Sequence, residues 1–144
     1  MTTETKKSPR VAIILVGLLA LIQLMRVGAY PIIQDALSGA NAEAWLFPAM
    51  TDVFVGSLAL FVAIAVWRRK SLAVWTSTIV FYAISISDHL DAISVLLTSK
   101  GPNPAMMNGS STVPMLVVMS LVEAAAIWAL TTKYMREHYL STTK

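Results

Sequence analysis

Four long apolar stretches separated by short polar segments dominate the pattern of this chain. Each stretch is close to the roughly 20 residues that an α-helix needs to cross the hydrocarbon core of a bilayer. The pattern predicts membrane-spanning helices over about residues 11–33, 47–67, 72–97 and 113–135. We therefore expect an all-α, multi-pass integral membrane protein whose single transmembrane domain covers residues 11–135 and forms a four-helix bundle.

The polar segments between the stretches predict how the helices run. Arg68, Arg69 and Lys70 separate the second and third helices so closely that the two must form an antiparallel hairpin. If each helix likewise runs opposite to the one before it, the four helices form an antiparallel up-down bundle. Both ends of the chain then lie on one side of the membrane.

The distribution of lysine and arginine predicts which side that is. These residues gather before the first helix, between the second and third, and after the fourth, whereas the connections 34–46 and 98–112 contain a single cation, Lys100. Cytoplasmic loops of membrane proteins carry an excess of Lys and Arg. We expect residues 1–10 and 136–144 to be cytoplasmic tails of a protein in the cell (plasma) membrane.

The first stretch also fits a second interpretation, a cleavable signal peptide. A basic segment that ends at Arg10 precedes an apolar core, and Val27 and Ala29 occupy the small-residue positions of a cleavage site. Arg26, directly before that site, is atypical of such a peptide, so we favour a membrane span.

The composition supports membrane residence and narrows the classes of function. Hydrophobic residues make up 56% of the chain and charged residues 13%, about half the share expected in a soluble domain. The absence of cysteine excludes disulfides, thiolate metal sites and a cysteine nucleophile. The net charge of +3 comes mostly from cations that flank the spans, so we expect the lipid bilayer, and no nucleic acid, as a partner.

Charged and titratable side chains inside the predicted spans are the main candidates for function. They are Arg26 in the first span, Asp52 in the second, Asp88, His89 and Asp91 in the third, and Glu123 in the fourth. At a rise of 1.5 Å per residue, all of them fall in the outer half of the membrane. An ionised side chain against lipid costs about 2.5–3.5 kcal/mol, so we expect these groups to turn inward to a shared site.

Helical phase identifies the residues expected to line this site and bind a substrate. At 100° per residue, the polar residues on or beside the inward stripes are Gln23, Tyr30, Tyr82, Ser85 and Asp91, of which Asp91 lies furthest round its helix. On the second span the acid heads a seam of small residues that suits close helix packing. We interpret the methionines as fillers of the core and loops.

Counting charges predicts the protonation state of the site. Arg26 is the one permanent cation among four acids, and a protonated His89 would add only one further positive charge. Two negative charges then have no partner. We therefore expect at least one acid, Glu123 or Asp52, to carry a proton at neutral pH, or a bound cation to replace that proton.

These groups favour general acid–base chemistry on a lipophilic small molecule. In this hypothesis Glu123 or Asp52 donates a proton to the substrate. Asp88 with His89 accepts one, and Arg26 holds the ionised partner. The reaction would be an isomerisation, an epoxide opening or a cyclisation. The set of acids around one arginine is similar to the acid–Arg–acid group of small epoxide hydrolases, which are soluble and have a different fold, so the likeness implies chemistry alone.

Two other functions stay open on the sequence. In an accessory or structural subunit of a larger membrane complex, the polar residues would fix the register of the helices. In a proton- or cation-coupled transporter of a small solute, they would carry the coupling ion, and four helices would then require a homodimer. The spacing of the candidate ligands fits neither a metal site nor paired axial haem ligands, so we predict no metal and no cofactor.

Overall fold

A computed structural model of the chain describes residues 9–38, 43–101, 103–104, 107 and 109–141. All regular structure in this part of the chain is helical, and it contains no strand. Four helical segments are long and apolar enough to cross a membrane: Arg10–Leu37, Glu43–Arg68, Leu72–Thr98 and Thr112–Thr131. The predictions of an all-α chain and of four helices able to span a membrane are therefore confirmed, which indicates an integral membrane protein.

The first span is not a uniform α-helix. It consists of α1 (Arg10–Ile22), the 3-10 helix η1 (Gln23–Ala29) and α2 (Tyr30–Leu37). Pro31 accounts for the tighter turn, because it has no N–H to offer the carbonyl of Val27, which instead accepts from the N–H of Tyr30. Residues three apart lie above one another in a 3-10 helix, so η1 turns Gln23 and Arg26 to the same side.

The second and third spans are long regular helices with a short connection between them. The 3-10 helix η2 (Glu43–Trp45) leads into α3 (Leu46–Arg68), and α4 (Leu72–Thr98) follows after residues 69–71. The backbone is extended at Arg69 and at Ser71. The Ser71 hydroxyl accepts a hydrogen bond from the N–H of Val74 at 3.2 Å, which caps the start of α4.

The fourth span ends earlier than the apolar pattern predicts. α5 (Thr112–Thr131) stops where Thr132 adopts an extended backbone, and α6 (Lys133–Leu140) begins directly after it. The boundary between the fourth span and the C-terminal segment therefore lies at Thr132, and not after residue 135 as the sequence predicts. Met135 and Tyr139 are buried, and α6 packs against α4 and α5 as a separate short helix.

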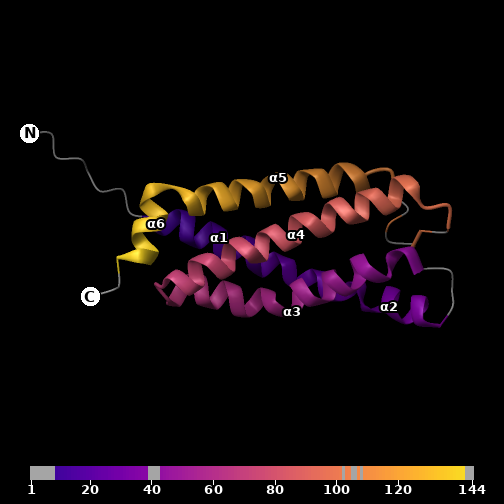
Figure 1. The fold of residues 1–144 in the computed structure, drawn as a ribbon, viewed down its shortest axis with the longest axis horizontal. Coiled ribbons are helices and arrows are strands. Elements are labelled where there is room, and N and C mark those ends of the chain that lie inside the picture. Colours follow the sequence, from indigo (N-terminus) through magenta and orange to yellow (C-terminus); the bar gives the residue numbers. More distant parts are fainter. Residues whose placement is uncertain (1–8, 39–42, 102, 105–106, 108, 142–144) are drawn as a thin grey trace, which may run out of the picture.

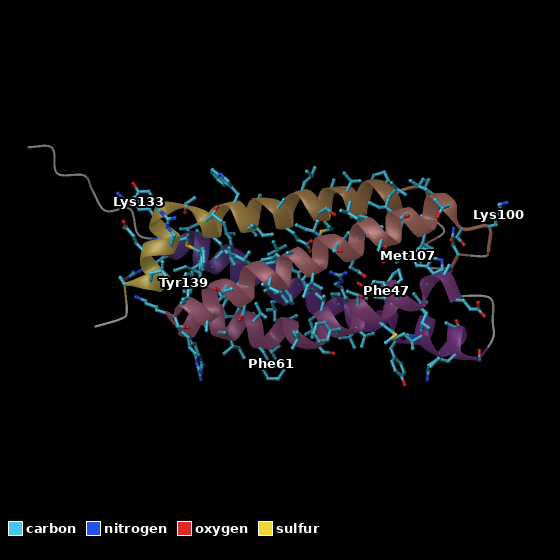
Figure 2. The ribbon with its side chains drawn as sticks, viewed as in Figure 1. Phe47, Phe61, Lys100, Met107, Lys133 and Tyr139 are labelled. Atoms are coloured by element: carbon cyan, nitrogen blue, oxygen red, sulfur yellow. The ribbon has the colours of Figure 1, made fainter. Side chains whose placement is uncertain are left out.

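The four spans lie side by side along the long axis of the molecule (Figure 1). α3 packs against α1, η1 and α4, and α4 also packs against α5. The end that carries α6 also holds the start of α1 and the connection between α3 and α4 (Figure 1). Lys133 and Tyr139 lie at this end, whereas Lys100 and Met107 lie toward the other end (Figure 2).

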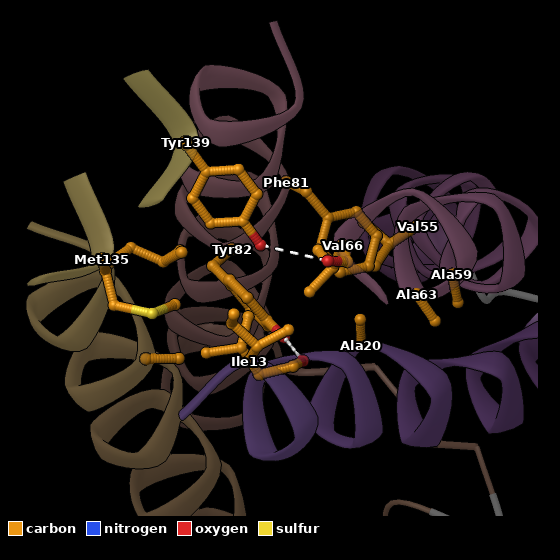
Figure 3. Packing of buried hydrophobic residues seen from close by; sticks show 13 residues of the cluster. Ile13, Ala20, Val55, Ala59, Ala63, Val66, Phe81, Tyr82, Met135 and Tyr139 are labelled. Carbon is orange, nitrogen blue, oxygen red and sulfur yellow. Dashed lines mark hydrogen bonds between the residues drawn. The ribbon is translucent and has the colours of Figure 1, made fainter. Parts of the chain in front are cut away.

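Two buried apolar clusters hold the helices together. The α6-side cluster, drawn in Figure 3, includes Ala20, Val55, Ala59, Ala63, Tyr82, Ala126 and Leu130. The far cluster includes Ala29, Trp45, Ala49, Ala92 and Leu116. Along every span, the charged and titratable residues predicted for the site (Arg26, Asp52, Asp88, His89, Asp91 and Glu123) fall between the positions that belong to these two clusters, so the fold gathers them at one level.

Candidate functional site

Seven polar side chains from the four spans meet between the two apolar clusters. They form what we call the polar cluster: Gln23, Arg26, Asp52, Ser85, Asp88, His89 and Glu123. The structure thus brings together the guanidinium and three of the four acids that the sequence places in one layer. Asp91 is the acid that stays outside.

Arg26 is the centre of the polar cluster. Its Nε donates to Asp52 Oδ1 on α3 and its Nη2 donates to Asp88 Oδ2 on α4, so one guanidinium bridges two carboxylates. The side chain of Arg26 is 9% exposed, and those of Asp52 and Asp88 are 16% and 2% exposed. Because these ion pairs are largely withdrawn from solvent, mobile ions screen them much less than surface pairs.

A closed ring of hydrogen bonds continues from the guanidinium toward α5. Arg26 Nη1 donates to Ser85 Oγ and to Gln23 Oε1, the latter at 3.3 Å. Glu123 Oε1 accepts from Ser85 Oγ at 2.6 Å and from Gln23 Nε2 at 2.7 Å. The ring orients the Gln23 amide, since its oxygen faces the guanidinium and its nitrogen faces the carboxylate.

His89 and Glu123 form a second branch of the polar cluster. Nδ1 of His89 lies 3.4 Å from Oε2 of Glu123, which is ion-pair distance when the imidazole is protonated. These two atoms and Asp88 Oδ1 are buried and have no hydrogen-bond partner in the described part of the chain. A proton held between the imidazole and the Glu123 carboxylate would satisfy the first two, so that Asp88 Oδ1 is the one of the three that still lacks a partner.

The close approach of η1 to α3 places Arg26 against Asp52. A Cβ atom at Gly56 of α3 would lie 2.8 Å from the backbone nitrogen of Val27 and 2.9 Å from its Cγ2. Both distances are shorter than real Cβ contacts, so glycine at this position is what permits the packing. Gly56 therefore supports the site through the spacing of two helix backbones.

A pocket of about 360 Å³ opens beside the polar cluster. Its polar lining residues are Gln23, Arg26, Asp52, Asp88 and His89. Its other lining residues are Ile22, Met25, Gly28, Ala29, Ala92, Met107, Met115, Leu116 and Met119. A small molecule in this pocket would contact apolar walls and, through the polar lining, the carboxylates that share the guanidinium.

Three residues that we predict to line the site lie elsewhere. Tyr30 is 53% exposed, because a 3-10 helix advances by about 120° per residue instead of 100°, which rotates this side chain away from Arg26. Tyr82 is buried, but its hydroxyl donates to the backbone carbonyl of Val16 inside the α6-side cluster. Asp91 is half-buried and makes no hydrogen bond or ion pair with the described residues.

Two other predicted residues, Ser85 and Glu123, belong to the polar cluster but are fully buried and do not line the pocket. The sequence interpretation also missed part of the lining, since four methionines taken as fillers border the pocket instead. The spacing of Met115 and Met119, which puts both on one face of α5, is the signal that could have revealed them. Flexible thioether side chains adapt well to irregular apolar ligands.

The polar cluster holds more acidic than basic groups. The polar cluster contains three carboxyls and one guanidinium, so even a protonated His89 leaves one carboxylate without a matching charge. Within the residues that the structure describes, no three His, Cys, Asp or Glu side chains are arranged to hold a metal ion. What the arrangement offers is a set of neighbouring groups that can donate and accept protons beside an apolar pocket.

Comparisons of the chain with family models, with curated proteins and with solved structures find no match. Function therefore has to be argued from the chemistry of the polar cluster and its pocket.

Proposed function

We propose that this protein is a multi-pass membrane enzyme that applies general acid–base catalysis to a lipophilic small molecule bound in the pocket. The observation that carries the proposal is the pocket lining, in which Asp52, Asp88, Arg26 and His89 share one cavity with apolar and methionine side chains. A polar layer that served only to align helices would need no cavity. A lipophilic substrate with one reactive polar group would need both kinds of lining.

We also propose that the spans form an antiparallel up-down bundle in the cell membrane with both termini in the cytoplasm. Cations gather at the end that carries α6: Arg10, Arg68, Arg69, Lys70, Lys133 and Arg136. Among the described residues, only Lys100 adds a cation at the opposite end. This asymmetry supports a cytoplasmic α6 end, with the pocket in the outer half of the membrane and open to substrate from the lipid.

In the proposed mechanism, the two carboxyls that Arg26 bridges have opposite roles. One carries a proton and donates it to the substrate, while the other is ionised and removes a proton from the substrate or from water. Asp52, which lines the pocket whereas Glu123 does not, is the proposed acid. Asp88, whose Oδ1 is bound to no described residue, is the proposed base. Arg26 donates to both and stabilises whichever carboxylate is ionised at each step.

Glu123 has a different role in this mechanism, because it is fully buried and does not line the pocket. We propose that it is a positioning residue, whose Oε2 orients His89 at 3.4 Å and stabilises the protonated imidazole. Of the two proton donors that the sequence leaves open, Glu123 and Asp52, this assignment selects Asp52.

The same acid and base support three reaction types, which differ in whether water is added to the substrate. Isomerisation and cyclisation move a proton from one substrate atom to another, so substrate and product have equal mass. Epoxide opening protonates the ring oxygen, breaks one C–O bond and forms another from a water that has lost a proton to the base. The product is then heavier by one water.

Comparing lipophilic extracts of cells tests the proposal. Cells would express the full chain, the Asp88→Asn variant or the Asp91→Asn variant at equal protein levels. Asp91 lies on the same helix but outside the polar cluster, so it is the matched control. We expect a compound that is present with wild type and Asp91→Asn and about 100-fold lower with Asp88→Asn. Identical extracts from wild type and Asp88→Asn would contradict the proposal.

One observation favours the accessory or structural subunit as a second candidate. The ring of Arg26, Ser85, Glu123 and Gln23 closes through side-chain hydrogen bonds and ties the first span to α4 and α5. In that case Glu123→Leu would lower the amount of the assembled complex, and no metabolite would change with Asp88→Asn. A coupled transporter has less support. In the part of the chain described, the α6-side cluster lies between the ring and the α6 end and is apolar, so it would not carry a coupling ion.

A further inference from the structure

A second pocket, of about 480 Å³, lies at the end of the molecule that carries α6. Its basic lining comes from three elements that are far apart in the sequence. They are Arg10 at the start of α1, the run Arg68, Arg69 and Lys70 at the end of α3, and His138 on α6. Four permanent cations around one cavity repel each other, so the pocket is suited to a ligand that brings negative charge.

No acidic residue lines this basic pocket among the described residues. Glu137, next to His138 in the sequence, is exposed and lies 4.0 Å from Lys133 on the same helix. Burial, and after it the charge of Lys70, lower the pKa of His138. The imidazole is therefore largely neutral near pH 7 and able to donate or accept a hydrogen bond, while the other lining cations keep an unbalanced positive charge.

The other wall of the basic pocket is apolar and closely built. It consists of Ile13, Ile14, Val66 and Trp67. The indole of Trp67 lies against Gly17 of α1, where an added Cβ atom would be 2.0 Å from the indole nitrogen.

Tyr139 of α6 holds the same region from the other side. Its hydroxyl donates to the carbonyl of Val66 at 3.2 Å, one of the two bonds dashed in Figure 3. The pocket wall is thus fixed by contacts from both α1 and α6.

We propose that this basic pocket binds the phosphate headgroup of an anionic phospholipid, with the glycerol and the first acyl carbons along the apolar wall. Guanidinium groups match phosphate oxygens with two parallel hydrogen bonds. The pocket lies where candidate spans begin and end, which is the level of lipid headgroups. Ile14 and Trp67 are also exposed on the outer surface, so the apolar wall continues onto the face that lipid would cover. This inference does not depend on the proposed catalytic function.

Native mass spectrometry of the purified full chain in non-ionic detergent tests the proposal. The chain would be titrated with dioleoyl phosphatidylglycerol and with dioleoyl phosphatidylcholine, which have the same acyl chains but differ in net charge. We expect the first phosphatidylglycerol to bind about tenfold more tightly or better. The double variant Arg68→Gln, Arg69→Gln should lose that preference. The control Lys133→Gln, Arg136→Gln removes the same charge from exposed α6 positions outside the pocket and should keep it.

Two further arms separate lipid binding in the pocket from binding of a free anion and from general attraction to the basic surface. Gly17→Ala leaves every charge in place but displaces the indole of Trp67, so it should weaken phosphatidylglycerol binding. This variant tests the pocket independently if the double variant fails to fold. Inorganic phosphate, compared with chloride at equal ionic strength, should not displace the lipid. Equal losses in the pocket and control double variants would show general surface attraction and overturn the proposal. Full displacement by inorganic phosphate would show a free-anion site and overturn it as well.

Discussion

The two buried halves of this protein satisfy their polar atoms in different ways. In the α6-side cluster, the hydroxyls of Tyr82 and Tyr139 donate to backbone carbonyls of Val16 and Val66 on neighbouring helices (Figure 3). In the polar cluster, the hydrogen bonds that join the spans run from side chain to side chain, and most of them involve a charged group.

This difference determines how sensitive each half is to substitution. A backbone carbonyl is present whatever the residue, so the tyrosine bonds survive most changes on the accepting helix. A side-chain network loses several bonds when one member changes, and the groups left behind are buried and unpaired. The two apolar clusters therefore hold the helices together, while the polar cluster places buried charged groups beside a pocket.

Removing the central cation should have the largest effect. Arg26→Gln leaves Asp52 and Asp88 buried without a compensating charge, so we expect the free energy of unfolding to fall by about 3–5 kcal/mol. Equilibrium unfolding in mixed micelles, followed by circular dichroism, measures this change. Adding Asp52→Asn and Asp88→Asn to Arg26→Gln should recover part of the loss, because no buried charge then lacks a partner. Wild-type stability in Arg26→Gln would show that water already compensates the two acids.

Crowding the contact between η1 and α3 should have the next largest effect. Gly56→Ala forces the backbone of Val27 away from α3, and overpacking of this kind costs about 1–3 kcal/mol of unfolding free energy. It should also displace Arg26 and reduce the accumulation of any product in the extract experiment.

Gly28→Ala is the matched control for that change. Gly28 lies in the same segment and lines the same pocket, but a Cβ atom there would meet nothing within 4 Å. We expect its unfolding free energy to stay within about 1 kcal/mol of wild type. Equal effects of the two alanines would mean that close packing of η1 on α3 does not position the arginine.

Removing one tyrosine hydroxyl from the α6-side cluster should have a smaller effect. Tyr82→Phe removes the bond to the Val16 carbonyl but keeps the ring in its apolar surroundings. The net contribution of such a bond is about 1 kcal/mol, and the same unfolding assay measures it. A loss as large as that of Arg26→Gln would contradict the distinction between the two halves.

The sequence was sufficient to predict the four spans and the level at which the charged residues meet. The spans follow from the length of the apolar runs, and the meeting follows from the cost of placing Arg26, Asp88 or Glu123 against lipid. Hydrophobic pattern and charge are properties of each segment alone, so they can be read without knowing the neighbours.

The details that depend on local backbone or on neighbours could not be predicted. Tyr30 leaves the site because Pro31 converts the preceding turn to a 3-10 helix, which a fixed 100° rotation does not anticipate. The cost of a charge against lipid turns Glu123 inward but does not name Gln23 and Ser85 as its partners. The sequence gives no clear signal for the helix break at Thr132, so the predicted fourth span continues past it to residue 135.

The smallest expected effect concerns His138 at the α6 end, where its pKa is lowered first by burial and then by Lys70. The folded chain therefore binds fewer protons at this residue than the unfolded chain, so the contribution of His138 to stability rises with pH. That contribution is fully present above the ordinary value of 6.5 and is lost as the pH falls through 6.5 to the lowered value. The side chain is only half-buried, so the change should be small.

Comparison of wild type with His138→Gln isolates this contribution from that of His89. We expect the difference in unfolding free energy between the two proteins to shrink from about pH 8 to about pH 5. The imidazole proton resonances should titrate below 6.5 in the folded chain. Lys70→Gln should move that midpoint part of the way back, since burial is the larger cause and stays in place, whereas Lys133→Gln should not move it. A midpoint at or above 6.5 would contradict the lowering of this pKa by burial and Lys70.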